Sequence, residues 1–255
     1  MIESYIRKQR EIKKILLMTH IVIGYPSLED SFKIVQEMVE AGVDLMELQI
    51  PFSEPMADGP VILKANQEAL AGGITIRDCI DFAARVTETF DIPFLFMTYY
   101  NILFKYGVDS FARTMVRIGV RGAIVPDLPP EEAEEYLTAM KRNNLSPVFI
   151  FAPNSSDARM RMIAGHGDGF IYCVARKGVT GQNTDFSADL DAGLARCRRA
   201  TDLPLAVGFG VKEKSDVDFL KGKADIAVIG SQTIRVVDEE GVGAIGDFIR
   251  GLRQD

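Results

Sequence analysis

One carboxylate lies inside an otherwise apolar stretch of this sequence. Glu47 is flanked by Leu45, Met46, Leu48 and Ile50. Burying a carboxylate costs several kcal/mol unless it is paired, and burial alone raises its pKa. Two interpretations are therefore open. Glu47 is either a structural glutamate satisfied by buried donors, or a general acid/base with a pKa closer to neutrality.

A second carboxylate follows in the next loop. Asp58 precedes Gly59 and Pro60, where the chain turns to begin a helix. Taken alone, Asp58 could be a helix cap. Together with Glu47 it makes acid/base chemistry the first functional hypothesis.

Three glycine-containing turns lie in the second half of the chain. They cover residues 176–181, 207–210 and 229–231, and each follows an apolar run. Glycine lets the backbone approach an anion closely, and the N-terminus of a helix directs N–H groups at it. The three turns together predict a site for the phosphate group of a small molecule.

The composition limits the possible functions. Of 255 residues, 47% are hydrophobic and 25% are charged, as in ordinary globular proteins. A net charge of −7 disfavours nucleic acid and anionic membranes as partners, and predicts an anion site made of backbone amides and helix dipoles with few lysines. Cys79, Cys173 and Cys197 form no CxxC motif, which predicts reduced thiols in the cytoplasm. Two histidines are too few for a His-rich metal site, so no metal is expected.

Neither a membrane span nor a cleavable signal is expected. No apolar run reaches 18 residues. The first apolar run, residues 15–23, is interrupted by Thr19 and His20.

Eight short apolar runs alternate with segments of helical spacing, which predicts parallel strands joined by crossover helices. We expect strands at 15–23, 44–50, 93–98, 122–125, 147–151, 169–174, 204–207 and 226–229. We expect helices at 31–40, 61–70, 76–90, 110–118, 130–142, 157–164, 190–200, 214–220, 232–237 and 242–252, after a charged N-terminal helix. Eight units in this length predict one α/β domain over residues 1–255, a (β/α)8 TIM barrel with extra helices at the N-terminus, after strand 2 and at the C-terminus. A doubly wound open sheet is the alternative.

An ordered series of motifs resembles the tryptophan synthase α subunit family over essentially the whole chain. The motifs are Glu47-Leu48, Ile50-Pro51-Phe52-Ser53, Pro55-Met56-Ala57-Asp58-Gly59-Pro60, Met97-Thr98-Tyr99-Tyr100-Asn101, Val125-Pro126-Asp127-Leu128-Pro129-Pro130-Glu131-Glu132, Gly178-Val179-Thr180-Gly181, Gly208-Phe209-Gly210 and Gly230-Ser231. The resemblance implies a (β/α)8 barrel that cleaves indole-3-glycerol phosphate to indole and glyceraldehyde 3-phosphate in tryptophan biosynthesis. It also implies a pyridoxal-phosphate β subunit as partner, in an α2β2 complex, with no cofactor in this chain itself.

The same resemblance implies roles for individual residues. Glu47 would protonate indole C3, and Asp58 would hydrogen-bond the ring nitrogen while the C–C bond breaks in a retro-aldol step. These roles need two carboxylates at opposite edges of one flat ring. The implied substrate pocket contains His20, Tyr99, Ile124, Tyr172, Thr180 and Phe209, and the implied phosphate site contains Gly181, Gly210, Gly230 and Ser231. Thr180 would order Asp58 when the loop after strand 6 closes as a lid.

The chain departs from the family pattern mainly on the expected functional face. His20 stands where the family has an aromatic residue, Gln49 replaces a glycine and Glu54 replaces an aspartate. Ala175 and Lys177 alter the lid, and Thr19, Val22 and Ile102 also differ. These changes favour a different β-subunit variant or weaker coupling to it. Two other functions stay open: a stand-alone lyase, and a non-catalytic barrel that binds a phosphorylated ligand or activates a β subunit.

Overall fold

The computed structural model describes residues 2–174, 188–208 and 210–253, and shows a closed barrel of parallel strands. The strands are β1 (Leu16–Val22), β2 (Leu45–Gln49), β3 (Phe94–Met97), β4 (Gly122–Ile124), β5 (Ser146–Phe151), β6 (Ile171–Val174), β7 (Leu205–Gly208) and β8 (Ile226–Ile229). They pair in chain order, and β1 closes the barrel against β8. The (β/α)8 barrel is therefore confirmed, and the open sheet is excluded.

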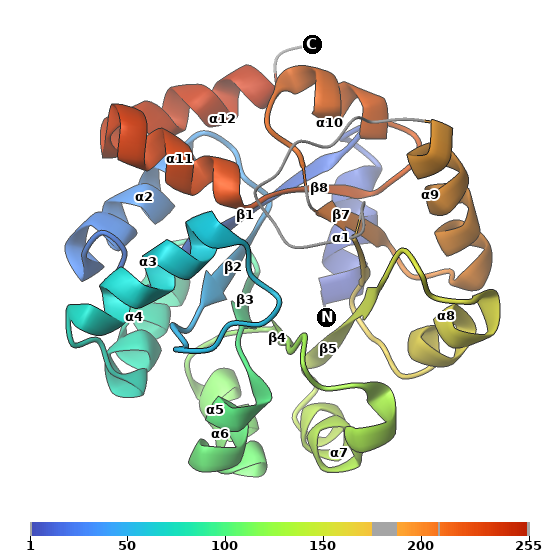
Figure 1. Cartoon of the computed structure of the whole chain (residues 1–255), viewed down its shortest axis with the longest axis horizontal. Coiled ribbons are helices and arrows are strands. Elements are labelled where there is room, and N and C mark those ends of the chain that lie inside the picture. The colour runs from blue at the N-terminus through green and yellow to red at the C-terminus, as the bar shows by residue number, and fades with distance from the viewer. Residues whose placement is uncertain (1, 175–187, 209, 254–255) are drawn as a thin grey trace.

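Most helices form a ring around the strands, and the first helix lies at one end of the barrel (Figure 1). The helices are α1 (Ile2–Arg10), α2 (Leu28–Glu40), α3 (Pro60–Ala71), α4 (Ile76–Thr89), α5 (Tyr100–Tyr106), α6 (Val108–Arg117), α7 (Glu134–Arg142), α8 (Asp157–Ala164), α9 (Ala188–Ala200), α10 (Lys214–Leu220), α11 (Ser231–Glu240) and α12 (Ile245–Arg253). Two 3-10 turns, η1 (Pro130–Glu132) and η2 (Val242–Ala244), precede α7 and α12. Within the described ranges, no helix combines the length and apolar character needed to cross a membrane.

The helix α5 was not predicted from the sequence. Its first N–H group, at Tyr100, donates to both carboxylate oxygens of Asp127, at 2.9 and 3.1 Å. This cap comes from a residue 27 positions away, so the local sequence does not reveal it. Gly107, with φ 87°, then separates α5 from α6.

Alternate strand residues fill the barrel interior, because side chains two positions apart share a face. Leu16 and Met18 of β1 and Leu45 of β2 lie in this interior cluster. Ile2 and Ile6 of α1 pack against the same cluster, so α1 covers the N-terminal end of the barrel. Functional side chains are consequently left to the other end.

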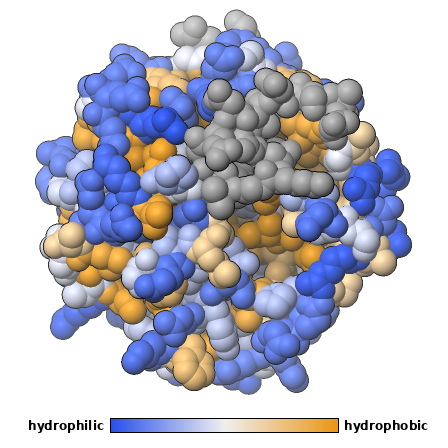
Figure 2. Space-filling model, viewed as in Figure 1, coloured by the Kyte–Doolittle hydropathy of each residue, from blue (hydrophilic) through white to orange (hydrophobic). Residues whose placement is uncertain are grey.

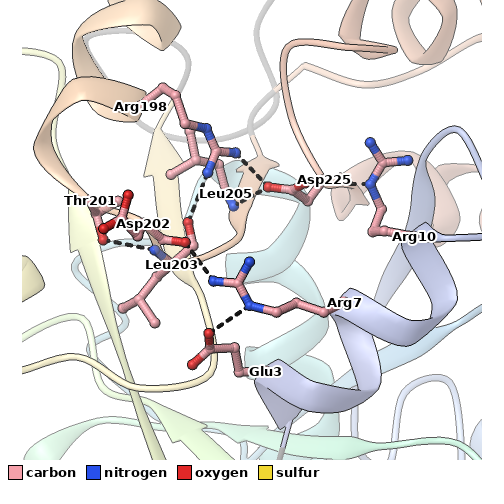
Figure 3. Close-up of polar contacts among 9 residues, drawn as sticks. All are labelled: Glu3, Arg7, Arg10, Arg198, Thr201, Asp202, Leu203, Leu205 and Asp225. Carbon is pink, nitrogen blue, oxygen red and sulfur yellow. Dashed lines mark hydrogen bonds and ion pairs between the residues drawn. The ribbon is translucent and has the colours of Figure 1, made fainter.

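A polar network fastens α1 and α9 to the N-terminal end of β8 (Figure 3). The carboxylate of Asp225 accepts hydrogen bonds from Arg10, Arg198 and the backbone N–H of Leu205. One turn earlier in α1, Arg7 donates to the carbonyl oxygen of Asp202 at 2.7 Å. Asp225 thus joins three elements that are distant in sequence.

We expect the substitution Asp225→Ala to lower the free energy of unfolding by about 1 to 3 kcal/mol, because it removes the acceptor of a buried backbone N–H group and of two arginines. Urea unfolding measures the change. Asp247→Ala is the matched control, since the side chain of Asp247 is 86% exposed in its pair with Arg250 and its loss should cost at most about 0.5 kcal/mol. Equal effects of the two substitutions would show that the Asp225 network does not stabilise the fold.

Candidate active site

A cavity opens at the C-terminal ends of the strands, where a (β/α)8 barrel carries its chemistry. It is lined by strand residues and by the loops that follow them: His20, Glu47, Ala57, Asp58, Ile62, Met97, Ile124, Pro126, Ile150, Tyr172, Gly210, Val211, Lys212, Gly230, Ser231 and Arg235. Glu47 and Asp58 therefore lie at one cavity, as their place in the sequence predicted.

Glu47 is paired with a histidine. The register of β1 and β2 places His20 beside Glu47, and Nδ1 of His20 lies 3.0 Å from Oε2 of Glu47. The two residues are only 4% and 3% exposed. Burial lowers the pKa of His20, but the hydrogen bond and charge of Glu47, with Asp58 and Gln49, outweigh it and raise the pKa above its usual value. Because of this pairing, the carboxylate is not an isolated buried charge.

Asp58 is held by a side chain of the preceding strand. Nε2 of Gln49 donates to Oδ2 of Asp58 at 2.7 Å. Burial raises the pKa of Asp58, while the hydrogen bond from Gln49 and the charge of His20 oppose the shift. Asp58 is not a helix cap, since α3 begins after Gly59 with no side-chain cap. The carboxyl of Asp58 is thus available to the cavity.

Tyr99 supports the loop that carries Asp58. Its hydroxyl accepts a hydrogen bond from the N–H of Ala57 at 3.1 Å, and its ring stacks on Phe52 with 5.0 Å between centroids. Tyr99 is 1% exposed and is absent from the lining of the cavity. The structure therefore places this expected pocket residue behind the loop.

The middle of the cavity is apolar. Ile124 and Tyr172, both expected there, line it together with Met97 and Ile150. Burial and the charges of Glu47 and Asp58 raise the pKa of Tyr172 well above its usual value, so the phenol stays neutral. A flat aromatic ligand fits such a surface, with polar groups at its edges.

The other end of the cavity combines backbone and cations. Gly210, Gly230 and Ser231 line it, and Gly230 is the N-cap of α11. The N-terminus of this helix directs N–H groups and a positive dipole towards an anion. Lys212 and Arg235 line the same cavity. Few lysines were expected at the anion site from the sequence, and neither of these two cations was among the expected residues. Arg235 could have been found from the sequence, because it stands four residues after Ser231 and so lies on the same helix face.

Some expected residues lie outside the part of the chain that the structure describes. They are Thr180 and Gly181 of the expected lid, Phe209, and the departures Ala175 and Lys177.

The chain matches the model of the family described as tryptophan synthase alpha chain over residues 6–249. It is 67% identical over 253 residues to the tryptophan synthase alpha chain of Syntrophotalea carbinolica, covering 99% of this chain and 100% of that protein. It is 63% identical over 252 residues to that of Desulforapulum autotrophicum, with coverage of 99% and 100%.

Solved structures agree with the sequence comparisons. The tryptophan synthase subunit alpha of Legionella pneumophila superposes with a TM-score of 0.90 at 31% identity, covering 99% of this chain and 97% of the other. A chain from the aminoacrylate-bound tryptophan synthase of Mycobacterium tuberculosis gives a TM-score of 0.90 at 28% identity, with the same coverage.

Proposed function

Because this chain belongs to the tryptophan synthase α chain family, whose members cleave indole-3-glycerol phosphate to indole and glyceraldehyde 3-phosphate, we propose that Glu47 and Asp58 carry out that cleavage in the barrel cavity. The observation that carries this assignment is the meeting of two carboxyl groups, Glu47 buried and Asp58 half-buried, and an anion-binding end at one cavity. An indole ring with a glycerol phosphate tail needs both.

The roles follow from where each group lies. The indole ring occupies the apolar middle, between the side chains of Ile124 and Tyr172. Glu47 gives a proton to C3 of the ring, which turns the enamine into an indolenine. Asp58 accepts a hydrogen bond from the ring N–H and stabilises the positive charge that develops there. The Glu47 carboxylate left by this transfer then takes the proton of the glycerol hydroxyl, and the C–C bond breaks to release indole and glyceraldehyde 3-phosphate.

The phosphate group lies at the other end, against Gly230, Ser231 and the N-terminus of α11, with Lys212 and Arg235 beside it. Backbone N–H groups and two cations offset the −7 charge of the chain locally. The chemistry on this chain needs no cofactor, and pyridoxal phosphate belongs to the β subunit.

Family membership implies a β subunit as partner, and we place the pair in an α2β2 complex in the cytoplasm. Met56, in the loop after β2, is 75% exposed, and Phe104 of α5 is 68% exposed. The face seen in Figure 2 carries hydrophobic side chains among hydrophilic ones near its centre. Exposed hydrophobic side chains at Met56 and Phe104 suit contact with a protein partner.

The decisive experiment is a cleavage assay with indole-3-glycerol phosphate, with and without a β subunit. Release of indole that the β subunit accelerates supports the α-subunit function. Unchanged turnover on addition of the β subunit would indicate a stand-alone lyase. An absence of cleavage under both conditions would leave a non-catalytic binding barrel.

We expect Gly230→Val to raise KM by about tenfold or more, equivalent to a loss of roughly 1.4 kcal/mol of binding. Among the described residues no atom lies within 4 Å of a Cβ built at Gly230, so a side chain there has room and enters the space expected for the phosphate. Steady-state kinetics measure the change. Gly243→Val is the control, because its Cβ is equally free but lies in η2. An unchanged KM in Gly230→Val would mean that the phosphate binds elsewhere.

A further inference from the structure

His20 and Gln49 are two departures from the family pattern: His20 lines the cavity, and Gln49 lies behind its wall against Asp58. Gln49 is fully buried and His20 nearly so. We propose that the two side chains are positioning residues that form one network, in which His20 holds Oε2 of Glu47 and Gln49 holds Oδ2 of Asp58. The inference rests on the proposed cleavage, whose acid/base groups are these two carboxyls.

The amide of Asn66 fixes the orientation of Gln49. Asn66 Nδ2 donates to the carbonyl oxygen of Ile62 at 2.8 Å, and Asn66 Oδ1 accepts from the N–H of Phe52 at 2.9 Å. Oδ1 of Asn66 still has a free lone pair, and Nε2 of Gln49 lies 3.4 Å from it and 2.7 Å from Oδ2 of Asp58. Both neighbours are acceptors, so the amide nitrogen of Gln49 must face them. Its oxygen, Oε1, is buried and has no hydrogen-bond partner among the described residues.

Two further buried atoms lack a hydrogen-bond partner in the described part of the chain: Nε2 of His20 and Oε1 of Glu47. A donor on His20 and the acceptor on Gln49 are chemically complementary, and Gln49 contributes as a hydrogen-bond acceptor to the raised pKa of His20. These two atoms are not hydrogen-bonded to each other in the described part of the chain, so the network consists of two hydrogen-bonded pairs, Glu47 with His20 and Gln49 with Asp58, coupled by the effect of Gln49 on His20. It occupies one oxygen of Glu47 and leaves Oε1 for the substrate.

Charged and titratable groups face His20 from several elements. Glu47 lies on β2 and Asp58 on the loop after it, and both raise the pKa of His20. Tyr172 of β6, Lys212 after β7 and Arg235 of α11 line the same cavity. The negative charges of Glu47 and Asp58 outweigh the effect of burial, so the imidazole keeps its second proton to a higher pH than a free histidine.

The network can be tested without turnover. The chain has two histidines, so NMR titration resolves His20 from the exposed His166. We expect His20 to titrate above its ordinary value in the wild type and lower in Glu47→Gln, which removes the negative charge. A pKa of His20 that is the same in both proteins would overturn the pairing.

Kinetics then test the positioning role. We expect His20→Phe and Gln49→Gly each to lower kcat about tenfold with little change in KM, the effect of losing one hydrogen bond to a charged group. The double variant should lose less than the product of the two factors, because the residues act through one network. In the wild type, the plot of kcat/KM against pH should show a limb whose midpoint equals the pKa of His20 measured by NMR. This limb should be absent from the plot for His20→Phe.

The outcomes separate this inference from the proposed function. The resemblance to the family implies that an aromatic residue fits at position 20, so His20→Phe should fold. Thermal unfolding checks this, and His166→Phe is the matched control. Suppose that the wild type cleaves the substrate, that the losses of the two single variants multiply in the double variant, and that His20→Phe keeps the wild-type pH profile. These results would overturn the network and leave the proposed function standing. If the pKa of His20 depends on Glu47 as expected but no cleavage occurs, even with a β subunit, the proposed function is overturned instead.

Discussion

Replacing Glu47 by glutamine is expected to lower kcat for cleavage of indole-3-glycerol phosphate by about 10²- to 10⁴-fold, the range of a lost general acid. Glutamine has nearly the same size, and its oxygen can still accept a hydrogen bond from Nδ1 of His20. The substitution therefore removes the transferable proton and keeps the packing. KM should change little, since the phosphate end of the cavity is untouched.

The measurement is indole release under single-turnover conditions, with and without a β subunit. Glu88→Gln is the matched control, because Glu88 lies exposed on α4. Thermal unfolding shows whether the variant has kept its fold. A Glu47→Gln protein that cleaves within tenfold of the wild type would remove Glu47 from the mechanism.

The sequence predicted the eight strands because a parallel sheet covered on both faces reads as short apolar runs. It also predicted that the loops after several strands line one cavity, because the C-terminal ends of parallel strands meet at one face. The missed helix α5 depends on a cap from Asp127. The single helix expected over 130–142 is instead η1 and α7, separated at Ala133, whose backbone lies outside the helical region at φ −99° and ψ 14°. Both features depend on contacts or backbone geometry that periodicity does not encode.

In the candidate site, too, the features encoded locally were predictable and those that depend on contacts between distant residues were not. The meeting of Glu47, Asp58, Gly210 and Gly230 at one cavity was predictable, because each stands at a strand end or in the loop after it. The pairing of His20 with Glu47 was not, since it depends on the register of β1 and β2 across 27 residues. Tyr99 was expected in the pocket, but it lies behind the loop, where its hydroxyl accepts from the N–H of Ala57 and also hydrogen-bonds Asp58. Sequence spacing predicts the end of the barrel at which a residue lies, but the hydrogen bonds of the folded chain determine which residue it pairs with.

The second large effect is expected from Asp58→Asn, which should lower kcat by roughly 10²-fold and change KM much less. An amide oxygen still accepts the ring N–H, so the substrate binds. A neutral amide does not stabilise the positive charge that forms on the ring as C3 is protonated, so the loss falls on the transition state. Asp81→Asn, on the exposed side of α4, is the control.

The pH dependence gives Asp58→Asn a second, independent signature. The pKa of Asp58 is raised, chiefly by burial, so its carboxyl takes up a proton at a higher pH than an exposed aspartate. Only the ionised form stabilises the cationic ring, so wild-type kcat should fall as the pH drops through that raised pKa. Asparagine does not titrate, and the acid limb should be missing from the profile of the variant. A raised KM with an unchanged kcat and an unchanged acid limb would show that Asp58 only binds the ring.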